Sequence, residues 1–340
     1  MSEAYHQYLI QLINTSCFSR RDYISSLLWE QGTFRKNSVL VHKLWKRRTS
    51  VSKAGERDSI QLHIEPYTGE NRYVLSLVSF LRTKLKDDLY GAYIQGSIAT
   101  REEIRYSDMD AVVILKDEVV SDAQRLARVA RKLYHAKAFF FKYDPLQHHG
   151  WFVLTEGMLQ NYNEAYFPVE LFRHSRSLLE DKAETLFIKR APVSWDAYRK
   201  AFKSVAFSLI KRLEAKNYPS NCYVLKSVLS EFMLLPSLYF QASNYKAIYK
   251  KDSFDAIKNH FKPEHWAIMD QVSQIRRDWD YSLSPLQRRI FSTYAYPIRK
   301  TARRWAPSIP ENMRKQLTPG FYTAMLGLIY KMVDKVDKAE

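Results

Sequence analysis

The stretch YIQGSIATREEIRYSDMDAVVIL, from Tyr93 to Leu115, is the most informative part of this 340-residue chain for its fold. It begins as a β-branched and aromatic strand that leads into Gly96-Ser97, and after a polar spacer it ends in a compact apolar strand, 109–115. Asp108 and Asp110 stand at the entrance to this second strand. Because residues two apart in a strand face the same way, we expect the two carboxylates to project together.

This pair of carboxylates needs a compensating charge. Asp is depleted in strands, and two like charges side by side repel each other. Oxygen-rich sites of this kind suit Mg²⁺ or Mn²⁺, which complete their coordination shell with water and phosphate oxygens. Gly96 would let the backbone approach a triphosphate, and the Ser97 hydroxyl would donate to its oxygens. The stretch therefore predicts a site for a metal ion and a nucleotide.

A Gly-Ser pair, a spacer and then Asp-x-Asp entering an apolar strand resembles the nucleotidyltransferase superfamily that includes DNA polymerase beta, poly(A) polymerases and CCA-adding enzymes. The resemblance covers residues 72–175. It implies a two-metal site in which Asp108 and Asp110 bind Mg²⁺ or Mn²⁺, while Gly96 and Ser97 bind the nucleotide. It also implies that a hydroxyl attacks the α-phosphorus of an NTP or dNTP in line and expels pyrophosphate.

The family carries a third carboxylate on a later strand, and Glu170 within FPVELF (167–172) matches it best. GWFVL (150–154) would be the neighbouring strand. The resemblance implies that Glu170 helps to bind the metal at the attacking hydroxyl and accepts the proton of that hydroxyl. The chain departs here from the family, which more often has Asp. Asp144, Glu156 and Glu164 are further candidates for this third acid.

His148 and His149 precede the predicted strand 150–154, beside the expected site. They could contact the substrate or pyrophosphate, or they could simply be polar residues at the entrance to a strand. No Cys or further His lies at ligand spacing from them, so a zinc site is not expected.

The order of elements predicts an α+β fold. Helical spacing runs through 70–87 and 121–140, and strand patterns occupy 89–95, 109–115, 150–154 and 167–172. After residue 189 the strand patterns stop, and helices are expected after Pro263, Pro285 and Pro319, with a bend or break at Pro236. We expect an N-terminal helical and basic extension over 1–58, a catalytic domain over 59–188 with a small mixed sheet, and a basic all-helical domain over 189–340.

The charge is concentrated in the last part of the chain. The whole sequence carries +17, and residues 189–340 contain 27 Lys and Arg against 13 Asp and Glu, which leaves +14. Basic pairs between 276 and 315 alternate with aromatic residues such as Trp279, Tyr281 and Trp305. Basic groups neutralise phosphates and aromatic rings stack on bases, so we expect this domain to bind nucleic acid, DNA or RNA, as the acceptor.

The composition also limits the class of protein. Only Cys17 and Cys222 are present, too few for a disulfide framework. No apolar run approaches the length of a membrane-spanning helix, so a cytoplasmic protein without a membrane partner is expected. The basic charge favours untemplated addition of nucleotides to nucleic acid. The competing hypotheses are synthesis of linear or cyclic oligonucleotide messengers in antiphage defence, a nucleotidyltransferase toxin that modifies tRNA, and a pseudoenzyme that binds nucleic acid.

Overall fold

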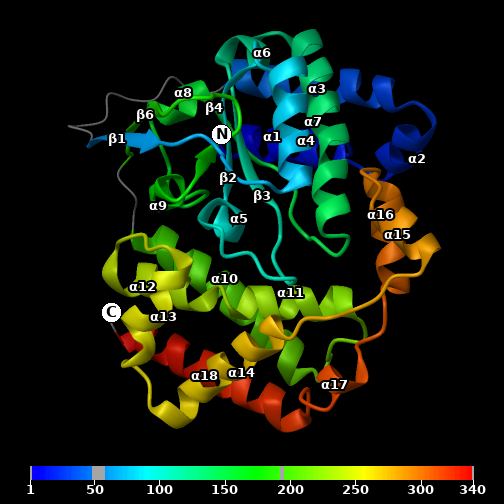
Figure 1. The fold of residues 1–340 in the computed structure, drawn as a ribbon. Helices are drawn as coiled ribbons and strands as arrows, with labels where there is room; N and C mark the ends of the chain where they lie inside the picture. The colour runs from blue at the N-terminus through cyan, green and yellow to red at the C-terminus, as the bar shows by residue number, and fades with distance from the viewer. Residues whose placement is uncertain (1, 48–57, 192–194, 339–340) are drawn as a thin grey trace.

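The computed structural model describes residues 2–47, 58–191 and 195–338. Its fold is α+β, as the sequence predicts: a small mixed sheet with helices is followed by an all-helical part. In Figure 1 the strands lie in the upper half of the molecule and most of the C-terminal helices in the lower half. The polar segment 48–57, between the N-terminal helices and the first strand, lies outside the described residues.

The main sheet has four strands in the order β4-β3-β2-β5. Its strands are β2 (Leu89–Gln95), β3 (Asp110–Leu115), β4 (Phe152–Thr155) and β5 (Arg176–Ser177). β3 is antiparallel to β2 and parallel to β4. β3 is apolar throughout after Asp110, and its residues 111–115 are fully buried because the sheet is covered on both faces. The predicted strands 89–95, 109–115 and 150–154 are confirmed, with shifts of one or two residues at their ends.

One face of this sheet is covered by α4 (Arg72–Lys84) and α7 (Ala123–Tyr143). The apolar spacing of the sequence predicts both helices. α7 begins at Asp122, whose carboxylate accepts hydrogen bonds from the backbone amides of Gln124 and Arg125, so the cap lies one residue after the expected Ser121. The N-terminal helices α1 (Ser2–Thr15), α2 (Arg20–Leu28) and α3 (Glu30–Lys46) pack on the same side, and α1 and α3 share their apolar core with β3 and α7.

The other face carries the strand pair β1 (Ser59–Ile64) and β6 (Glu184–Lys189), together with the short helices α8 (Glu156–Leu159) and α9 (Val169–Arg173). The short helix α6 (Asp117–Ser121) packs on α3 and α7 on the first face, and the turn α5 (Gly96–Thr100) follows the end of β2. The strand predicted over 167–172 is wrong, because residues 169–173 form the helix α9. Pro168 starts the turn, and the Glu164 carboxylate accepts a hydrogen bond of 3.2 Å from the Val169 amide, which caps a helix instead of extending a strand.

After β6, the described residues form helices only. Their bounds are α10 (Trp195–Glu214), α11 (Cys222–Phe232), α12 (Leu235–Asn244), α13 (Lys250–Lys258), α14 (Pro263–Arg277), α15 (Pro285–Phe291), α16 (Tyr296–Ala302), η1 (Arg303–Trp305), α17 (Glu311–Arg314) and α18 (Pro319–Lys338). The chain breaks between α11 and α12 just before Pro236, and Ser284 and Gln287 form a capping box at the start of α15. These helices enclose a second core, separate from that of the sheet.

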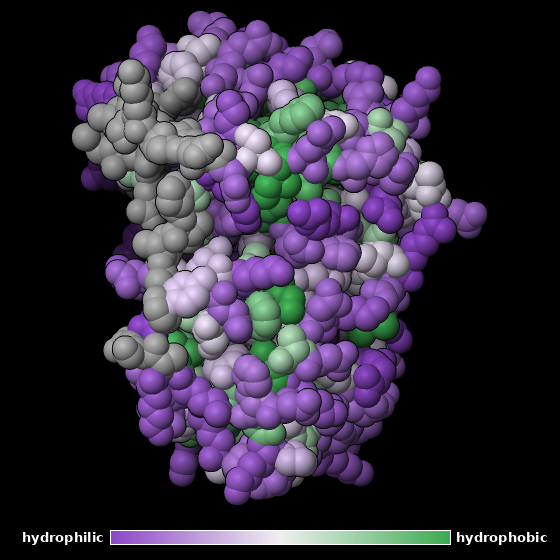
Figure 2. Space-filling model, turned by 90° about the vertical axis from the view of Figure 1, so that its left-hand side faces the viewer, coloured by the Kyte–Doolittle hydropathy of each residue, from purple (hydrophilic) through white to green (hydrophobic). Residues whose placement is uncertain are grey.

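The two halves contact each other at several places. The loop between α5 and β3 descends to α11 (Figure 1), where the buried Tyr106 hydroxyl donates to the Lys226 carbonyl at 2.8 Å and lies 2.7 Å from Ser230 Oγ. In the other direction α16 returns to the upper half, and the Tyr134 hydroxyl accepts from the Tyr296 amide. The side of the molecule seen in Figure 2 is mostly hydrophilic, with hydrophobic side chains in small patches. Among the described residues, no helix is both long enough and apolar enough to cross a membrane.

Candidate active site

The Gly-Ser turn and the Asp-x-Asp segment meet at one end of the sheet. Gln95 pairs with Asp110 in the register of β2 and β3, so the next residue, Gly96, lies beside Asp110. Gly96 has φ +68°, a left-handed conformation that favours glycine, and a Cβ added there would lie 3.5 Å from Asp110 Oδ2. Ser97 Oγ donates to Ser107 Oγ at 2.9 Å, one residue before Asp108. The structure therefore brings together four of the five residues that the sequence predicts for the site.

Asp108 lies against a lysine that the sequence does not predict for the site. Lys226 comes from α11 in the helical part, and its Nζ lies 2.6 Å from Asp108 Oδ1 and 2.7 Å from Asp144 Oδ2. The side chains of Lys226, Asp144 and Asp108 are 0%, 5% and 13% exposed. The Tyr281 hydroxyl donates to the other oxygen of Asp144 at 3.4 Å. Of the candidates for the third acid, Asp144 is therefore the one that joins Asp108.

The three carboxylates differ in their proton affinity. Burial would raise the pKa of Asp108, but the charge of Lys226 together with the hydrogen bonds from Asp144 and Lys226 outweighs it and lowers that pKa to about 2. Burial, followed by the nearby charge of Asp108, raises the pKa of Asp110 to about 6. Burial also raises the pKa of Asp144, against the opposing effect of Lys226. Asp108 is thus held ionised by a buried lysine, while Asp110 bears the cost of a desolvated charge.

Asp110 has an unsatisfied oxygen. Its Oδ1 is buried and has no hydrogen-bond partner among the residues that the structure describes. An ionised carboxylate without a partner is costly to bury, and such groups in native proteins usually mark a bound ion, a bound water or a catalytic role.

The backbone around the acids is fixed from both halves of the molecule. The Gln147 side chain accepts from the Met109 amide at 2.9 Å and donates to the Met109 carbonyl at 2.8 Å, so it holds the residue between the two aspartates. Arg299 of α16 donates to the carbonyls of Pro145 and Gln147 at 3.2 and 3.0 Å. These contacts position the acids through the loop that follows α7.

His148 is half-buried near Asp108 and packs on Tyr223, with ring centroids 4.0 Å apart. Burial lowers its pKa to about 3, and its Nε2 has no hydrogen-bond partner within the described part of the chain. The imidazole is therefore neutral at neutral pH. His149 stacks on Phe152 with ring centroids 6.4 Å apart.

Basic residues of the helical part surround this cluster. The Arg276 guanidinium lies 4.7 Å from the centre of the Tyr106 ring, and Arg303 lies 5.2 Å from the centre of the Tyr223 ring that packs on His148. Burial and then the charge of Arg276 lower the pKa of Lys250 to about 8, while Asp110 and Asp108 oppose this shift. Part of the positive charge that the sequence places in the last half of the chain thus lies close to the acids.

Glu170 has different surroundings from those expected. It lies on α9, where its carboxylate pairs with Arg173 at 3.1 Å and lies 3.8 Å from His174. Within the described ranges, neither Arg173 nor His174 also forms an ion pair with Asp108 or Asp110, so no basic group links Glu170 to the two aspartates. Glu164 caps Val169 and pairs with Arg190 at 3.6 Å, and Glu156 accepts from the Asp117 amide at 3.4 Å, so these two acids are also engaged elsewhere.

The donor set fits a divalent cation in part. Over residues 2–47, 58–191 and 195–338, no group of three or more His, Cys, Asp or Glu side chains is arranged to hold a metal ion. Asp108 and Asp110 nevertheless offer two hard carboxylates, and the partnerless Asp110 Oδ1 is the kind of oxygen that Mg²⁺ binds when water and phosphate complete its shell.

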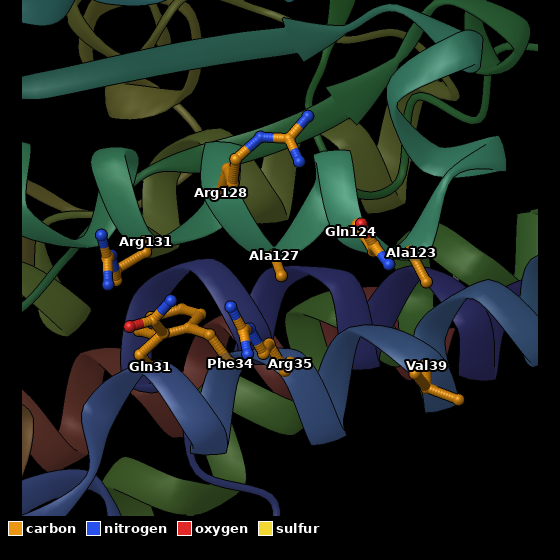
Figure 3. A pocket seen from close by; sticks show the side chains of 9 residues that line it. All are labelled: Gln31, Phe34, Arg35, Val39, Ala123, Gln124, Ala127, Arg128 and Arg131. Atoms are coloured by element: carbon orange, nitrogen blue, oxygen red, sulfur yellow. The ribbon is translucent and has the colours of Figure 1, made fainter.

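Two cavities lie outside the acid cluster. One, of about 470 Å³, lies between α3 and α7 and is lined by Gln31, Phe34, Arg35, Val39, Ala123, Gln124, Ala127, Arg128 and Arg131 (Figure 3). Ala127, in the lining of this cavity, lies 17 residues before Asp144 along α7. At the rise of an α-helix this is roughly 25 Å, so the cavity is remote from the acids. The other, of about 300 Å³, borders α5 beside the Gly-Ser turn and is lined by Glu65, Pro66, Thr68, Ala99, Thr100, Arg101 and Arg176.

No protein-family model matches the chain, and no curated protein matches it. Among solved structures it is similar to the spectinomycin adenyltransferase AAD(9) from Enterococcus faecialis, solved with ATP and spectinomycin, at 12% sequence identity. The match covers 68% of this chain and 100% of that chain with a TM-score of 0.34.

Proposed function

We propose that this protein is a metal-dependent nucleotidyltransferase, which moves a nucleoside monophosphate from an NTP or dNTP to an acceptor hydroxyl and releases pyrophosphate. The observation that carries the proposal is the meeting of Gly96 and Asp110. A glycine turn with φ +68° lies against a carboxylate whose buried Oδ1 has no partner in the described structure, and Asp108 lies two residues before that carboxylate. This combination suits a metal ion bound to a polyphosphate.

The proposed roles follow from these positions. Asp108 and Asp110 would hold Mg²⁺ or Mn²⁺, which when bound lowers the pKa of the attacking hydroxyl and neutralises charge on the phosphates. Gly96 leaves the backbone open to the triphosphate, and Ser97, held by Ser107, presents its hydroxyl beside it. Lys250 and Arg276 supply positive charge next to the acids for the departing pyrophosphate.

Glu170 remains the acid predicted to accept the proton of the attacking hydroxyl. The variant Glu170→Gln tests this role separately from metal binding. Lost turnover with unchanged Mn²⁺ affinity supports it, whereas full turnover removes Glu170 from the mechanism. The matched control is Glu156→Gln, which changes an acid that the proposal does not use.

We propose nucleic acid as the acceptor, because the basic residues near the site belong to the half of the chain that carries +14 of the +17. Purified protein with Mg²⁺ or Mn²⁺ is incubated with each α-labelled NTP or dNTP, with and without DNA or tRNA, and the products are resolved by gel and thin-layer chromatography. Extension or end-labelling of the nucleic acid supports the proposal. Small products formed without nucleic acid would identify a messenger synthase, and no product under any condition would contradict nucleotidyl transfer.

A further inference from the structure

We propose that Lys226 takes the place of one of the two cations expected from the sequence, so that the site holds a single divalent cation, bound by Asp108 and Asp110. This inference rests on the proposed function and deepens it. Its basis is the space that the lysine occupies between Asp108 and Asp144, together with the buried Oδ1 of Asp110, which has no hydrogen-bond partner in the described structure.

The ammonium group fills a cation position. Its nitrogen lies 2.6 Å from Asp108 Oδ1 and 2.7 Å from Asp144 Oδ2. A magnesium ion bridging these same oxygens would lie about 2.1 Å from each and would therefore overlap the ammonium nitrogen. A metal ion and Lys226 cannot occupy this position together.

Lys226 is held in place. Its side chain is 0% exposed, and Nζ lies 4.9 Å from the centre of the Tyr106 ring. The Tyr106 hydroxyl donates to the backbone carbonyl of Lys226 at 2.8 Å, which fixes the middle of α11 against the loop that precedes β3. To admit a metal here, the lysine would have to break both ion pairs and leave a position in which its side chain is fully buried. We therefore expect Lys226 to stay in the cluster and a metal ion not to displace it.

The remaining opening is at Asp110. Its Oδ1 is buried and without a partner in the described structure, and Gly96 leaves room beside its Oδ2. Three aspartates and one lysine carry a charge of about −2 once all are ionised, which one divalent cation balances. Two divalent cations beside Lys226, Lys250 and Arg276 would leave a strong excess of positive charge until a nucleotide bound.

The test counts Mn²⁺ ions bound per chain without nucleotide, from the loss of the free Mn²⁺ signal in electron paramagnetic resonance. The full-length protein is expected to bind one, and Lys226→Met is expected to bind two, because the position between Asp108 and Asp144 becomes free. Lys251→Met removes an exposed lysine from α13 and is expected to bind one. Circular dichroism confirms that each variant is folded.

A second pair of variants keeps the test decisive if Lys226→Met does not fold. Asp144→Asn is expected to keep one Mn²⁺, whereas Asp110→Asn is expected to keep none. Two ions in the unmodified protein, one ion in folded Lys226→Met, or loss of Mn²⁺ from Asp144→Asn would each overturn the inference while leaving a nucleotidyltransferase possible. No Mn²⁺ binding by the unmodified protein would overturn the metal-dependent function and the inference together.

Discussion

Asp110 bears a cost that a purely structural residue would not bear. Burial and the neighbouring Asp108 raise its pKa from 3.8 to about 6, so above pH 6 the folded state holds an ionised carboxylate that is more stable in the unfolded chain. Asp110→Asn removes this cost and is expected to raise the free energy of unfolding of the metal-free protein by about 1–3 kcal/mol at pH 7.5. Urea denaturation of the variant measures it.

The same Asp110→Asn protein is expected to lose nucleotidyl transfer. Asp270→Asn, which changes an exposed aspartate on α14, is the control for the general effect of removing one negative charge. A variant that is less stable than the unmodified protein by more than about 1 kcal/mol would show that Asp110 supports the fold, contrary to the site proposed for it.

His148 makes the stability of the protein depend on pH. Its pKa is about 3 in the folded state and near 6.5 when unfolded, because burial disfavours the imidazolium. The unfolded chain therefore gains a proton as the pH falls through 6.5, and the folded state does not until far lower pH. The stability contributed by neutral His148 is present above pH 6.5 and is lost progressively below it.

Between pH 7 and pH 5 this loss amounts to about 2 kcal/mol. We expect the unmodified protein to lose that much more stability over this interval than His148→Gln, measured by urea denaturation of both proteins at both pH values. His63→Gln, at a histidine whose side chain is 67% exposed, should behave as the unmodified protein does. Parallel losses in His148→Gln and the unmodified protein would contradict a neutral His148.

Among the elements, the loop between α5 and β3 depends on Tyr106. Its hydroxyl contacts the Lys226 carbonyl and Ser230 Oγ in the helical core, at 2.8 and 2.7 Å. Tyr106→Phe leaves the buried carbonyl without this donor, so we expect the free energy of unfolding to fall by about 1–2 kcal/mol in urea denaturation. Tyr90→Phe, at a tyrosine that is 38% exposed, is the control. An equal effect in the two variants would contradict an anchoring role for Tyr106.

Local pattern is enough to predict the strands and helices that build the site. The alternation of apolar residues and the proline positions predict β2, β3, α4, α7, α14, α15 and α18, and the Gly-Ser and Asp-x-Asp segments predict the end of the sheet where the acids lie. FPVELF misleads because its apolar run is as compatible with a helical turn as with a strand, and Pro168 and the Glu164 carboxylate both favour the start of a helix at Val169.

The rest of the site could not be predicted because it is assembled from distant parts of the chain. Lys226 is 118 residues from Asp108 in sequence, and on a helix with an apolar face nothing distinguishes it from a solvated lysine. Gln147 reaches the backbone of Met109, and backbone contacts leave no pattern in sequence. The position of Lys226 depends on how the helical part docks on the sheet, and that of Gln147 depends on how the loop after α7 folds back on β3; both are properties of tertiary packing.

For the molecule as a whole, the charge excess makes its own prediction. If the basic helical part binds nucleic acid, affinity should fall steeply with salt concentration, because each neutralised phosphate releases a counterion. Arg303→Ala/Arg304→Ala is expected to weaken binding at least about tenfold at low salt and to reduce the slope of log affinity against log salt by about 2. Fluorescence anisotropy of a labelled oligonucleotide measures both.

The control for that pair is Lys335→Ala/Lys338→Ala, which removes two exposed positive charges at the end of α18, the last helix of the lower half in Figure 1. If both double variants weakened oligonucleotide binding equally, the positive charge would attract nucleic acid non-specifically and Arg303 and Arg304 would not form a defined binding surface. A flat response of the unmodified protein to salt would leave the acceptor as a small molecule.

Transfer of a nucleoside monophosphate at Asp108 and Asp110 can be tested by following the two ends of the triphosphate. The protein is incubated with Mg²⁺, a nucleic-acid acceptor and NTP labelled either at the α-phosphorus or at the γ-phosphorus. We expect the α-label to appear in the acceptor and the γ-label in pyrophosphate, and Asp108→Asn/Asp110→Asn to abolish both. Label transfer that survives in the double variant, or release of the γ-label as orthophosphate alone, would contradict nucleotidyl transfer at these two acids.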